Sequence, residues 1–363
     1  MICKEIASAG TSIWLDDLSR SKITGHDEHS LPSRILHADV VGVTTNPSIF
    51  NSAISKGAEY ASDIQSLNGF TAEQVVQKLT TDDVRNACDL FATTARNSLD
   101  GRVSIEVDPR KAHQTQATID EGVALWNLVD RSNAMIKVPA TLEGLPAVTA
   151  LISLGISVNV TLIFSVERYV QVIEAFMSGL EIRASKGEEL SSVSSVASFF
   201  ISRIDTAVDD KLKSHSSPQA TALLGKAAIA NASIAYEAFE KVLQSPRWKL
   251  LSDEGAHMQR PLWASTGVKD PAYDDTRYVI ELIAPHTVNT MPQATLDALL
   301  DHGVYRGENL SSTYSQSHAI VNQLFEIGID LDEVTTYLEH DGVKKFIASW
   351  EELLANVSQV MNP

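Results

Sequence analysis

Cysteine and long apolar runs are both scarce in this sequence. Its 363 residues include only two cysteines, Cys3 and Cys88, whose number and spacing exclude a disulfide framework and a cysteine zinc site. No stretch offers the roughly 18 uninterrupted apolar residues of a membrane span. The first ten residues, MICKEIASAG, lack the apolar core of a signal peptide. We therefore expect a cytoplasmic protein with no membrane partner.

Basic charge is also limited. The chain has 29 Lys and Arg against 46 Asp and Glu, a net charge of −17, and the acidic residues are scattered rather than gathered into a tail. Such a field repels phosphate backbones, so nucleic acid is not an expected partner. An anionic small molecule would need a few local cations to bind.

Motifs for metals and cofactors are missing as well. The ten histidines show no metal-ligand spacing, and no glycine pattern forms a nucleotide-binding loop. The sequence thus contains no recognisable motif for a metal ion or for a nucleotide. His286 begins a predicted strand and could line a site, although a structural role is the simpler interpretation, and Trp263 is expected in the core.

What the sequence does contain is a regular alternation of strand-like runs with segments of helical period. Alternation of this kind predicts parallel pairing, and eight units indicate closure. We therefore predict an α/β fold, a (β/α)8 TIM-type barrel, with an open doubly wound sheet as the alternative. The predicted strands are 11–16, 40–45, 102–107, 134–139, 156–164, 196–202, 260–266 and 286–291.

Helix signals support this pattern. The stretch 71–97 has apolar residues at helical spacing and opens on Thr71 with a capping-box sequence. A second helix begins after Ser165, a good N-cap, and a third, over 294–303, stops at Gly303.

Two stretches exceed the minimal repeat. Residues 204–255 are predicted to be a mostly helical insertion with a break at SHSSPQ, and residues 315–361 to be additional C-terminal helices. Both are expected to pack outside the barrel or across one mouth. No shift in composition marks a boundary, so 1–363 is predicted to be a single domain.

Polar residues recur where the predicted strands end. In a (β/α)8 barrel the chemistry takes place at the C-terminal ends of the strands, so these side chains are the candidate site. In chain order they are Asp16, Asn46, Glu106, Lys137, Asn159, Thr161, Ser198, Arg203 and Lys269.

Each candidate also has a structural explanation. Asp16 could cap the following helix, and Asn46 could shape a turn in the segment TNPS. Glu106 and Lys137 could form a buried ion pair between neighbouring strands. Thr161 could be a β-branched strand residue and nothing more.

Lys137 is the hardest of these to explain by structure alone. It lies in the segment MIKVPAT between Ile136 and Val138, so its amine would be desolvated near the end of a strand. Desolvation disfavours the ammonium form, and a neutral amine is what a nucleophile needs to attack a carbonyl.

Five segments then resemble a known family. In this order, GVTTNPSIF, SIEVDPR, MIKVPAT, NVTLIFS and SFFISRID are similar to the signature segments of transaldolases, over about residues 11 to 303. The lengths of the insertion and of the C-terminal helices are similar to the longer bacterial branch. The resemblance implies a metal-independent Schiff-base transferase of the pentose phosphate pathway, without a cofactor and often dimeric.

The implied reaction moves a dihydroxyacetone unit between sugar phosphates. Sedoheptulose 7-phosphate or fructose 6-phosphate would be the donor, and glyceraldehyde 3-phosphate or erythrose 4-phosphate the acceptor. The resemblance makes Lys137 the Schiff-base lysine and Asp16 the general acid and base. It also gives Glu106 the proton transfers of imine formation, with a water held by Thr161.

The remaining implied roles concern substrate binding. By the same resemblance, Asn46 and Asn159 would hold the dihydroxyacetone hydroxyls, and Arg203 with Ser198 would bind the phosphate. This chain reads ASTGVK where many relatives have Ala-Ser-Phe-Arg or Ala-Ser-Phe-Lys, and SFF where Ser-Pro-Phe is commoner. Lys269 is thus either a phosphate ligand or a solvated surface lysine.

Two rival functions remain at this stage. A lyase on the same scaffold would release dihydroxyacetone without an acceptor. Phe200 favours transfer, because the related aldolases tend to have a tyrosine there, although core packing would also explain a phenylalanine. A non-catalytic sugar-phosphate-binding barrel is the other rival, and the presence of Lys137, Asp16 and Glu106 disfavours it.

Overall fold

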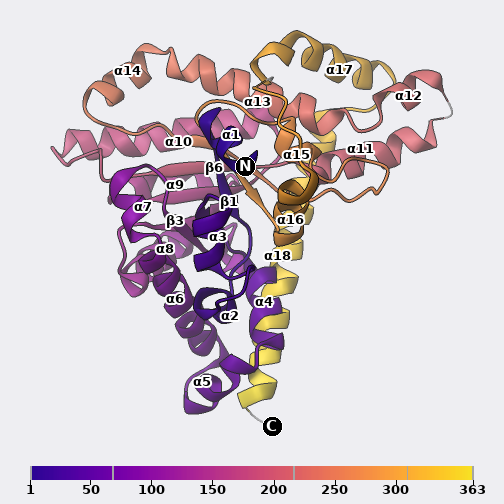
Figure 1. The fold of residues 1–363 in the computed structure, drawn as a ribbon. Helices are drawn as coiled ribbons and strands as arrows, with labels where there is room; N and C mark the ends of the chain where they lie inside the picture. The colour runs from indigo at the N-terminus through magenta and orange to yellow at the C-terminus, as the bar shows by residue number, and fades with distance from the viewer. Residues whose placement is uncertain (1, 68, 216, 309, 362–363) are drawn as a thin grey trace.

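The fold is an eight-stranded barrel surrounded by helices (Figure 1). A computed structural model describes residues 2–67, 69–215, 217–308 and 310–361. Among these residues, no helix is both long and apolar enough to cross a membrane.

The eight predicted strands all form, and all pair in parallel. They close in sequence order, with β1 bonded to both β2 and β8, so the predicted barrel is confirmed and the open doubly wound sheet is wrong. The strands are β1 (Thr11–Leu15), β2 (Val40–Val43), β3 (Arg102–Glu106), β4 (Ala134–Pro139), β5 (Val158–Ile163), β6 (Ser195–Phe200), β7 (Arg260–Ala264) and β8 (Thr287–Met291).

The register of the central strands brings polar side chains to one level of the barrel. Glu106 on β3 is paired with Lys137 on β4, which is paired in turn with Asn159 on β5. All three are buried. Because every strand runs in the same direction, the C-terminal ends of all eight meet at one mouth, where active sites of such barrels lie.

Helices cover the outside of the barrel. The predicted N-caps are present: Thr71 forms a capping box with Gln74, and Ser165 accepts a hydrogen bond from the backbone N–H of Arg168. The helices up to β6 are α1 (Ile2–Ser8), α2 (Arg20–Thr24), α3 (Leu31–His37), α4 (Pro47–Lys56), α5 (Ala61–Ser66), α6 (Ala72–Leu90), α7 (Ala92–Asn97), α8 (Thr115–Val129), α9 (Gly144–Ser153) and α10 (Val166–Ser185), with short 3₁₀ turns at Ala58–Tyr60 and Pro109–Lys111.

The helix predicted over 71–97 is in fact two helices. α6 ends at Leu90 and α7 begins at Ala92. Phe91 lies between them with ψ near zero (φ −92°, ψ 2°), outside the helical range, and its ring is fully buried. Burial of this ring thus accompanies a bend that the helical period of the sequence does not reveal.

Between β6 and β7 the described residues form four helices. α13 packs against α10, α11 and the later helix α17, which places this layer on the outside of the barrel (Figure 1). One residue of the predicted break SHSSPQ lies outside the described residues, and α11 ends and α12 begins on either side of it. The four are α11 (Ser202–Ser214), α12 (Pro218–Leu223), α13 (Ala227–Leu243) and α14 (Pro246–Asp253).

The chain after β7 is also helical. α15 (Arg277–Ile280) precedes β8, and α16 (Gln293–His302) follows it and stops at Gly303, as predicted. A 3₁₀ turn (Leu310–Thr313) leads into α17 (Tyr314–Glu326) and then into the 31-residue helix α18 (Leu331–Met361). That 1–363 folds as one domain stays a prediction.

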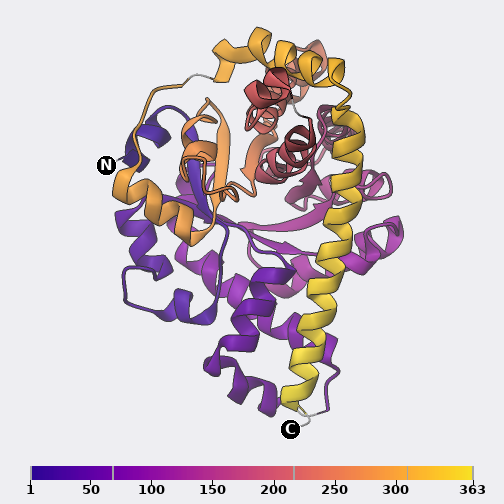
Figure 2. The ribbon, with the colours of Figure 1, turned by 90° about the vertical axis from the view of Figure 1, so that its right-hand side faces the viewer.

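α18 runs along one side of the whole molecule and passes the mouth of the barrel (Figure 2). It packs against α4, α6 and α11. Side-chain contacts hold it in place: the hydroxyls of Ser48 and Ser349 are 2.8 Å apart, and Nε of Arg168 is 3.1 Å from a carboxylate oxygen of Glu339. The last helix of the chain therefore forms part of the wall around the strand ends.

Candidate active site

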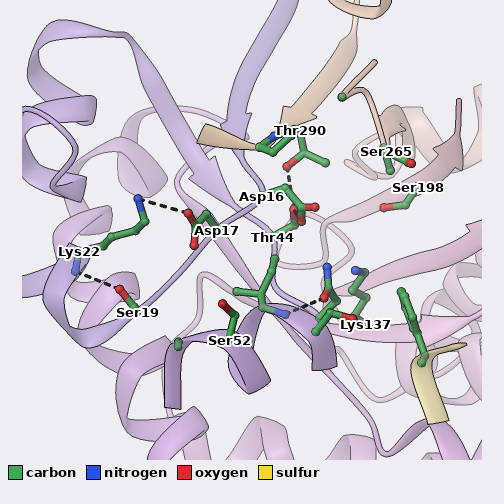
Figure 3. A pocket seen from close by; sticks show the side chains of 18 of the residues that line it. Asp16, Asp17, Ser19, Lys22, Thr44, Ser52, Lys137, Ser198, Ser265 and Thr290 are labelled. Carbon is green, nitrogen blue, oxygen red and sulfur yellow. Dashed lines mark hydrogen bonds and ion pairs between the residues drawn. The ribbon is translucent and has the colours of Figure 1, made fainter. Parts of the chain in front are cut away.

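A cavity of about 690 Å³ opens at the C-terminal ends of the strands. Its lining comes from the ends of β1, β2, β4, β6, β7 and β8, together with α2, α4, α11 and α18. Figure 3 shows Asp16, Thr44, Ser198 and Lys137 directed toward its centre.

Lys137 lies at the floor of this cavity and is only 4% exposed. Its Nζ donates a hydrogen bond to the carbonyl oxygen of Thr45 (3.0 Å) and lies 3.5 Å from Oε2 of Glu106. The ring of Phe346, from α18, has its centroid 5.8 Å from the same nitrogen. The amine is thus fixed among one carbonyl, one carboxyl group and one aromatic ring.

Glu106 is the partner of Lys137 across neighbouring strands. At 3.5 Å the contact is an ion pair rather than a strong hydrogen bond, and neither carboxyl oxygen has a hydrogen-bond partner among the described residues. Burial raises the pKa of Glu106 to about 7, and the nearby Lys137 opposes the shift. A carboxyl group with this pKa can both give and take a proton near neutral pH. The buried ion pair proposed from the sequence is therefore present.

Asp16 lies just past β1 and is held by Thr44, which in turn contacts Thr290. The hydroxyl of Thr44 donates to Oδ1 of Asp16 (2.5 Å), and the hydroxyls of Thr44 and Thr290 are 2.7 Å apart. Burial raises the pKa of Asp16, while the positive charge of Lys137 and the hydrogen bond from Thr44 act against the increase. The capping alternative is wrong, because Ser19 caps the following helix.

Asn159 belongs to a buried hydrogen-bonded row beneath the cavity. Its amide nitrogen donates to the Ser104 hydroxyl (3.0 Å), and its Oδ1 accepts from the Ser198 hydroxyl (2.6 Å). Ser198 lines the cavity, whereas Asn159 does not. These hydrogen bonds fix the orientation of Ser198. They also occupy both the oxygen and the nitrogen of the Asn159 side-chain amide.

Asn46 follows β2, before Lys137 in the chain, and Thr161 lies on β5, the strand after that of Lys137. Oδ1 of Asn46 accepts from the backbone N–H of Ile49 (3.0 Å) and caps α4, so its structural role is that of a helix N-cap rather than of the expected turn. The residue also lines the cavity. The Thr161 hydroxyl is fully buried on β5 without a hydrogen-bond partner among the described residues. Thr161 and Glu106 thus lie on the two strands that flank β4, and each has a buried side-chain oxygen without a hydrogen-bond partner among the described residues.

Cationic groups gather at the side of the cavity near β6 and β7. Arg203, in the first turn of α11, lies with its Cζ 5.2 Å from the ring centroid of Phe200, and its Nη1 is buried without a hydrogen-bond partner in the part of the chain described. Burial lowers the pKa of this guanidinium, opposed by the carboxylates of Asp341 and Asp16. An unpaired, half-buried guanidinium is suited to an anion.

Lys269 lies at the rim of the same side. It is exposed, and it lines both the main cavity and a neighbouring one of about 320 Å³ that contains Asp205, Asp209 and Asp270. The structure therefore places Lys269 within the candidate site but more loosely than Arg203.

Several lining residues have no signal in the sequence. Thr44 and Thr290 meet only because β1, β2 and β8 close the barrel. Ser265 follows β7 with a left-handed backbone (φ 55°), and its hydroxyl lies 3.0 Å from that of Ser202. Phe346 comes from a helix far along the chain.

The two minor expectations have different outcomes. Trp263 is fully buried and its ring N–H donates to the carbonyl oxygen of Leu282, so it is a core residue. His286 is exposed at the start of β8, at the end of the barrel opposite the mouth, and does not line the cavity. Across the described ranges, no three His, Cys, Asp or Glu side chains are arranged to hold a metal ion.

Comparison with known proteins agrees with this geometry. Residues 13–357 match the family model described as transaldolase/fructose-6-phosphate aldolase. A protein of Renibacterium salmoninarum named transaldolase is 53% identical over 362 residues, which cover 99% of this chain and 96% of the relative.

Two further relatives carry the same name. The transaldolase of Mycolicibacterium smegmatis is 52% identical and that of Mycobacterium tuberculosis 51% identical, each over 354 residues, 96% of this chain and 94% of the relative. The family match covers all of the barrel except the first two residues of β1, and most of α18. The chain therefore belongs to the transaldolase/fructose-6-phosphate aldolase family.

Proposed function

We propose that the protein is a transaldolase that carries a dihydroxyacetone unit on Lys137. The donors are sedoheptulose 7-phosphate or fructose 6-phosphate, and the acceptors glyceraldehyde 3-phosphate or erythrose 4-phosphate. The observation that supports this best is the position of Lys137, buried at the floor of the strand-end cavity and within 3.5 Å of Glu106. Relatives at 51–53% identity with this name support the same reaction.

The first step is formation of the imine. The amine of Lys137 attacks the C2 ketone of the donor, and the resulting carbinolamine loses its hydroxyl as water. Glu106 gives the proton that this hydroxyl needs in order to leave, which its raised pKa permits near neutral pH. Thr161, whose buried hydroxyl has no partner among the described residues, holds the water that carries the proton.

The second step is cleavage of the bond between C3 and C4. Asp16 takes the proton of the C4 hydroxyl, the bond breaks, and its electron pair moves into the iminium to give an enamine on Lys137. Asp16 lines the cavity and receives a hydrogen bond from Thr44, which orients the carboxylate. The aldose phosphate leaves and the dihydroxyacetone unit stays bound.

The last steps reverse the first two on a new aldehyde. The enamine carbon attacks the acceptor carbonyl, Asp16 returns its proton to the new hydroxyl, and water hydrolyses the iminium to free Lys137. Asn46 and Asn159 are proposed to hold the hydroxyls of the dihydroxyacetone unit. For Asn159 this requires the amide hydrogen that does not bond Ser104, since its oxygen already accepts from Ser198.

Arg203 and Ser198 are proposed to bind the phosphate, with Lys269 at the rim. For Ser198 this requires its hydroxyl hydrogen to leave the oxygen of Asn159, to which it donates in the structure. The unpaired Nη1 of Arg203 supports this role, because a guanidinium fork matches phosphate oxygens well. A homodimer and a cytoplasmic location also remain proposals.

Borohydride reduction tests the mechanism. With fructose 6-phosphate present, reduction should fix a dihydroxyacetone-derived mass on Lys137, located by mass spectrometry of the peptides. Lys241→Ala removes an exposed lysine on α13 and should label normally. A label on another residue, or none, would contradict the assignment of Lys137.

The rival lyase makes a separate prediction. It would release free dihydroxyacetone from fructose 6-phosphate alone, and an added aldose phosphate would not increase the rate at which fructose 6-phosphate is consumed. Phe200, which lines the cavity and has no hydroxyl to hold or relay a proton, supports transfer. A strict requirement for the acceptor would exclude the lyase as the main activity.

A further inference from the structure

One face of α18 lies against the barrel mouth. Gly342 and Phe346 are four residues apart, so both lie on this face, and both are buried. The helix is held there by the contacts of Ser349 with Ser48 and of Glu339 with Arg168, and by a hydrogen bond from Asn51 to Glu352 (2.9 Å). This face is therefore fixed over the strand ends.

Gly342 lets the helix approach closely. A Cβ at this position would lie 3.1 Å from Cδ2 of Leu162 and 3.5 Å from Cε2 of Phe164, at the end of β5. Glycine inside a helix is less favourable than alanine, so its presence fits a need for close contact rather than for helix stability. The close approach brings the next turn of α18 to the cavity.

This close approach places Phe346 at the cavity. The residue lines the cavity, is 4% exposed, and its ring centroid lies 5.8 Å from Nζ of Lys137. Figure 3 shows α18, in yellow, beside Lys137. A phenyl ring has no group that binds water, so it makes this side of the amine apolar.

We propose that Phe346 determines the fate of the enamine by keeping water from the carbon next to the imine carbon. This proposal rests on the proposed transaldolase function. If water reaches the enamine, the C=C electron pair takes a proton from it at C3, and the hydroxide left behind attacks the resulting iminium at C2. The proton of the new hydroxyl then passes to the nitrogen, the C–N bond breaks and the C2 carbonyl forms. The products are free dihydroxyacetone and the amine of Lys137, and no acceptor is consumed.

The test is a ratio of two products. Wild type and variants receive fructose 6-phosphate and erythrose 4-phosphate, and free dihydroxyacetone is measured against sedoheptulose 7-phosphate. Phe346→Ala is expected to raise this ratio about tenfold, which corresponds to roughly 1.4 kcal/mol between the two barriers. The ratio does not depend on how much protein is folded, so partial unfolding cannot imitate the effect.

Further variants sharpen the result. Phe346→Leu keeps an apolar side chain and should raise the ratio less than Phe346→Ala does. Tyr337→Ala removes an aromatic side chain that is 64% exposed on the same helix and should leave the ratio unchanged. Gly342→Leu must push α18 away from the mouth and should raise it.

Two results would overturn the proposal. An unchanged ratio in Phe346→Ala, with transfer still measurable, would show that the ring does not exclude water. An equal loss of imine in Phe346→Ala and Phe346→Leu at a constant ratio would mean that the ring stabilises the cationic iminium instead. Failure of the proposed function looks different, because wild type itself would then form no sedoheptulose 7-phosphate.

Discussion

The two ends of the cavity are built in different ways. At one end Lys137 and Glu106 lie on adjacent strands, paired in register and buried. At the other end Arg203 lies in the first turn of a helix, Ser265 follows β7 with positive φ, and Lys269 is exposed on the same loop. The reactive groups are held by the sheet, and the cations by the segments that leave it.

This difference suits the demands of the two ends. A nucleophile and a proton donor must keep a fixed distance, which hydrogen-bonded strands provide. A phosphate is bound by charge and by several donors, which tolerates looser placement. Substitutions at the strand-borne end should therefore change the rate of the chemical steps, and those at the loop-borne end the affinity for the phosphate.

The largest effect is expected for Lys137→Ala. It removes the only group proposed to form a covalent bond with the donor, so transfer should fall below detection while the barrel remains folded. Transfer assays and circular dichroism measure the two properties, with Lys241→Ala as a control for loss of an exposed positive charge. Transfer comparable to wild type would refute the Schiff-base assignment.

Glu106→Gln should come next. It keeps the shape of the side chain but cannot lose or give a proton as a carboxyl group does, so kcat should fall about 10²- to 10⁴-fold while the KM for phosphorylated donors changes little. A loss confined to KM would place Glu106 in binding instead.

The pH dependence of imine formation gives a finer test of Glu106. Its pKa is raised to about 7, so the proton needed for loss of water is present below that pH and lost above it. In single-turnover trapping, the rate of imine formation should show a decline above about pH 7 in wild type. Glu106→Gln should lack this decline, and a decline that persists in the variant would come from another group.

At the other end, Arg203→Ala should mainly weaken binding. Loss of a charge-assisted contact costs about 1.5–3 kcal/mol, so the KM for fructose 6-phosphate should rise about 10- to 100-fold. Arg203→Lys keeps the charge but loses the fork and should give an intermediate value. When an unphosphorylated ketose is the donor, the KM of both variants for that donor should be similar to the wild-type value. An equal loss with the unphosphorylated donor would contradict the phosphate role.

The smallest effect is expected for Lys269→Ala. Because this side chain is exposed and shared with an acidic neighbouring cavity, its contribution to phosphate binding is screened by water. We expect a change of about threefold or less in KM, reduced further by added salt. An effect as large as that of Arg203→Ala would show that Lys269 moves onto the phosphate when the substrate binds.

The same contrast explains what could be predicted from the sequence. The strands, and the residues Glu106 and Lys137 on them, could be predicted from the sequence. A polar residue within an apolar, β-prone run stands out from its neighbours. The paired burial of the two was also proposed, since strands that follow one another in such a fold are neighbours.

Other parts depend on contacts between distant segments. The hydrogen bond from Thr44 to Asp16, and the contact of Thr44 with Thr290, exist only once the first and last strands meet. The break at Phe91 coincides with burial of its ring, which the helical period of the sequence does not reveal. The sequence also gave no sign that Asn159 would be engaged by Ser104 and Ser198, because both contacts cross between strands.

The position of α18 has a consequence for biosynthesis. All eight strands precede α18 in the chain, so during translation the barrel can close, and Lys137 and Glu106 can meet, before Phe346 has been made. A barrel at that stage would hold its nucleophile in place with one wall of the cavity missing. The strands that form the barrel are therefore synthesised before the residue that completes the wall of the cavity.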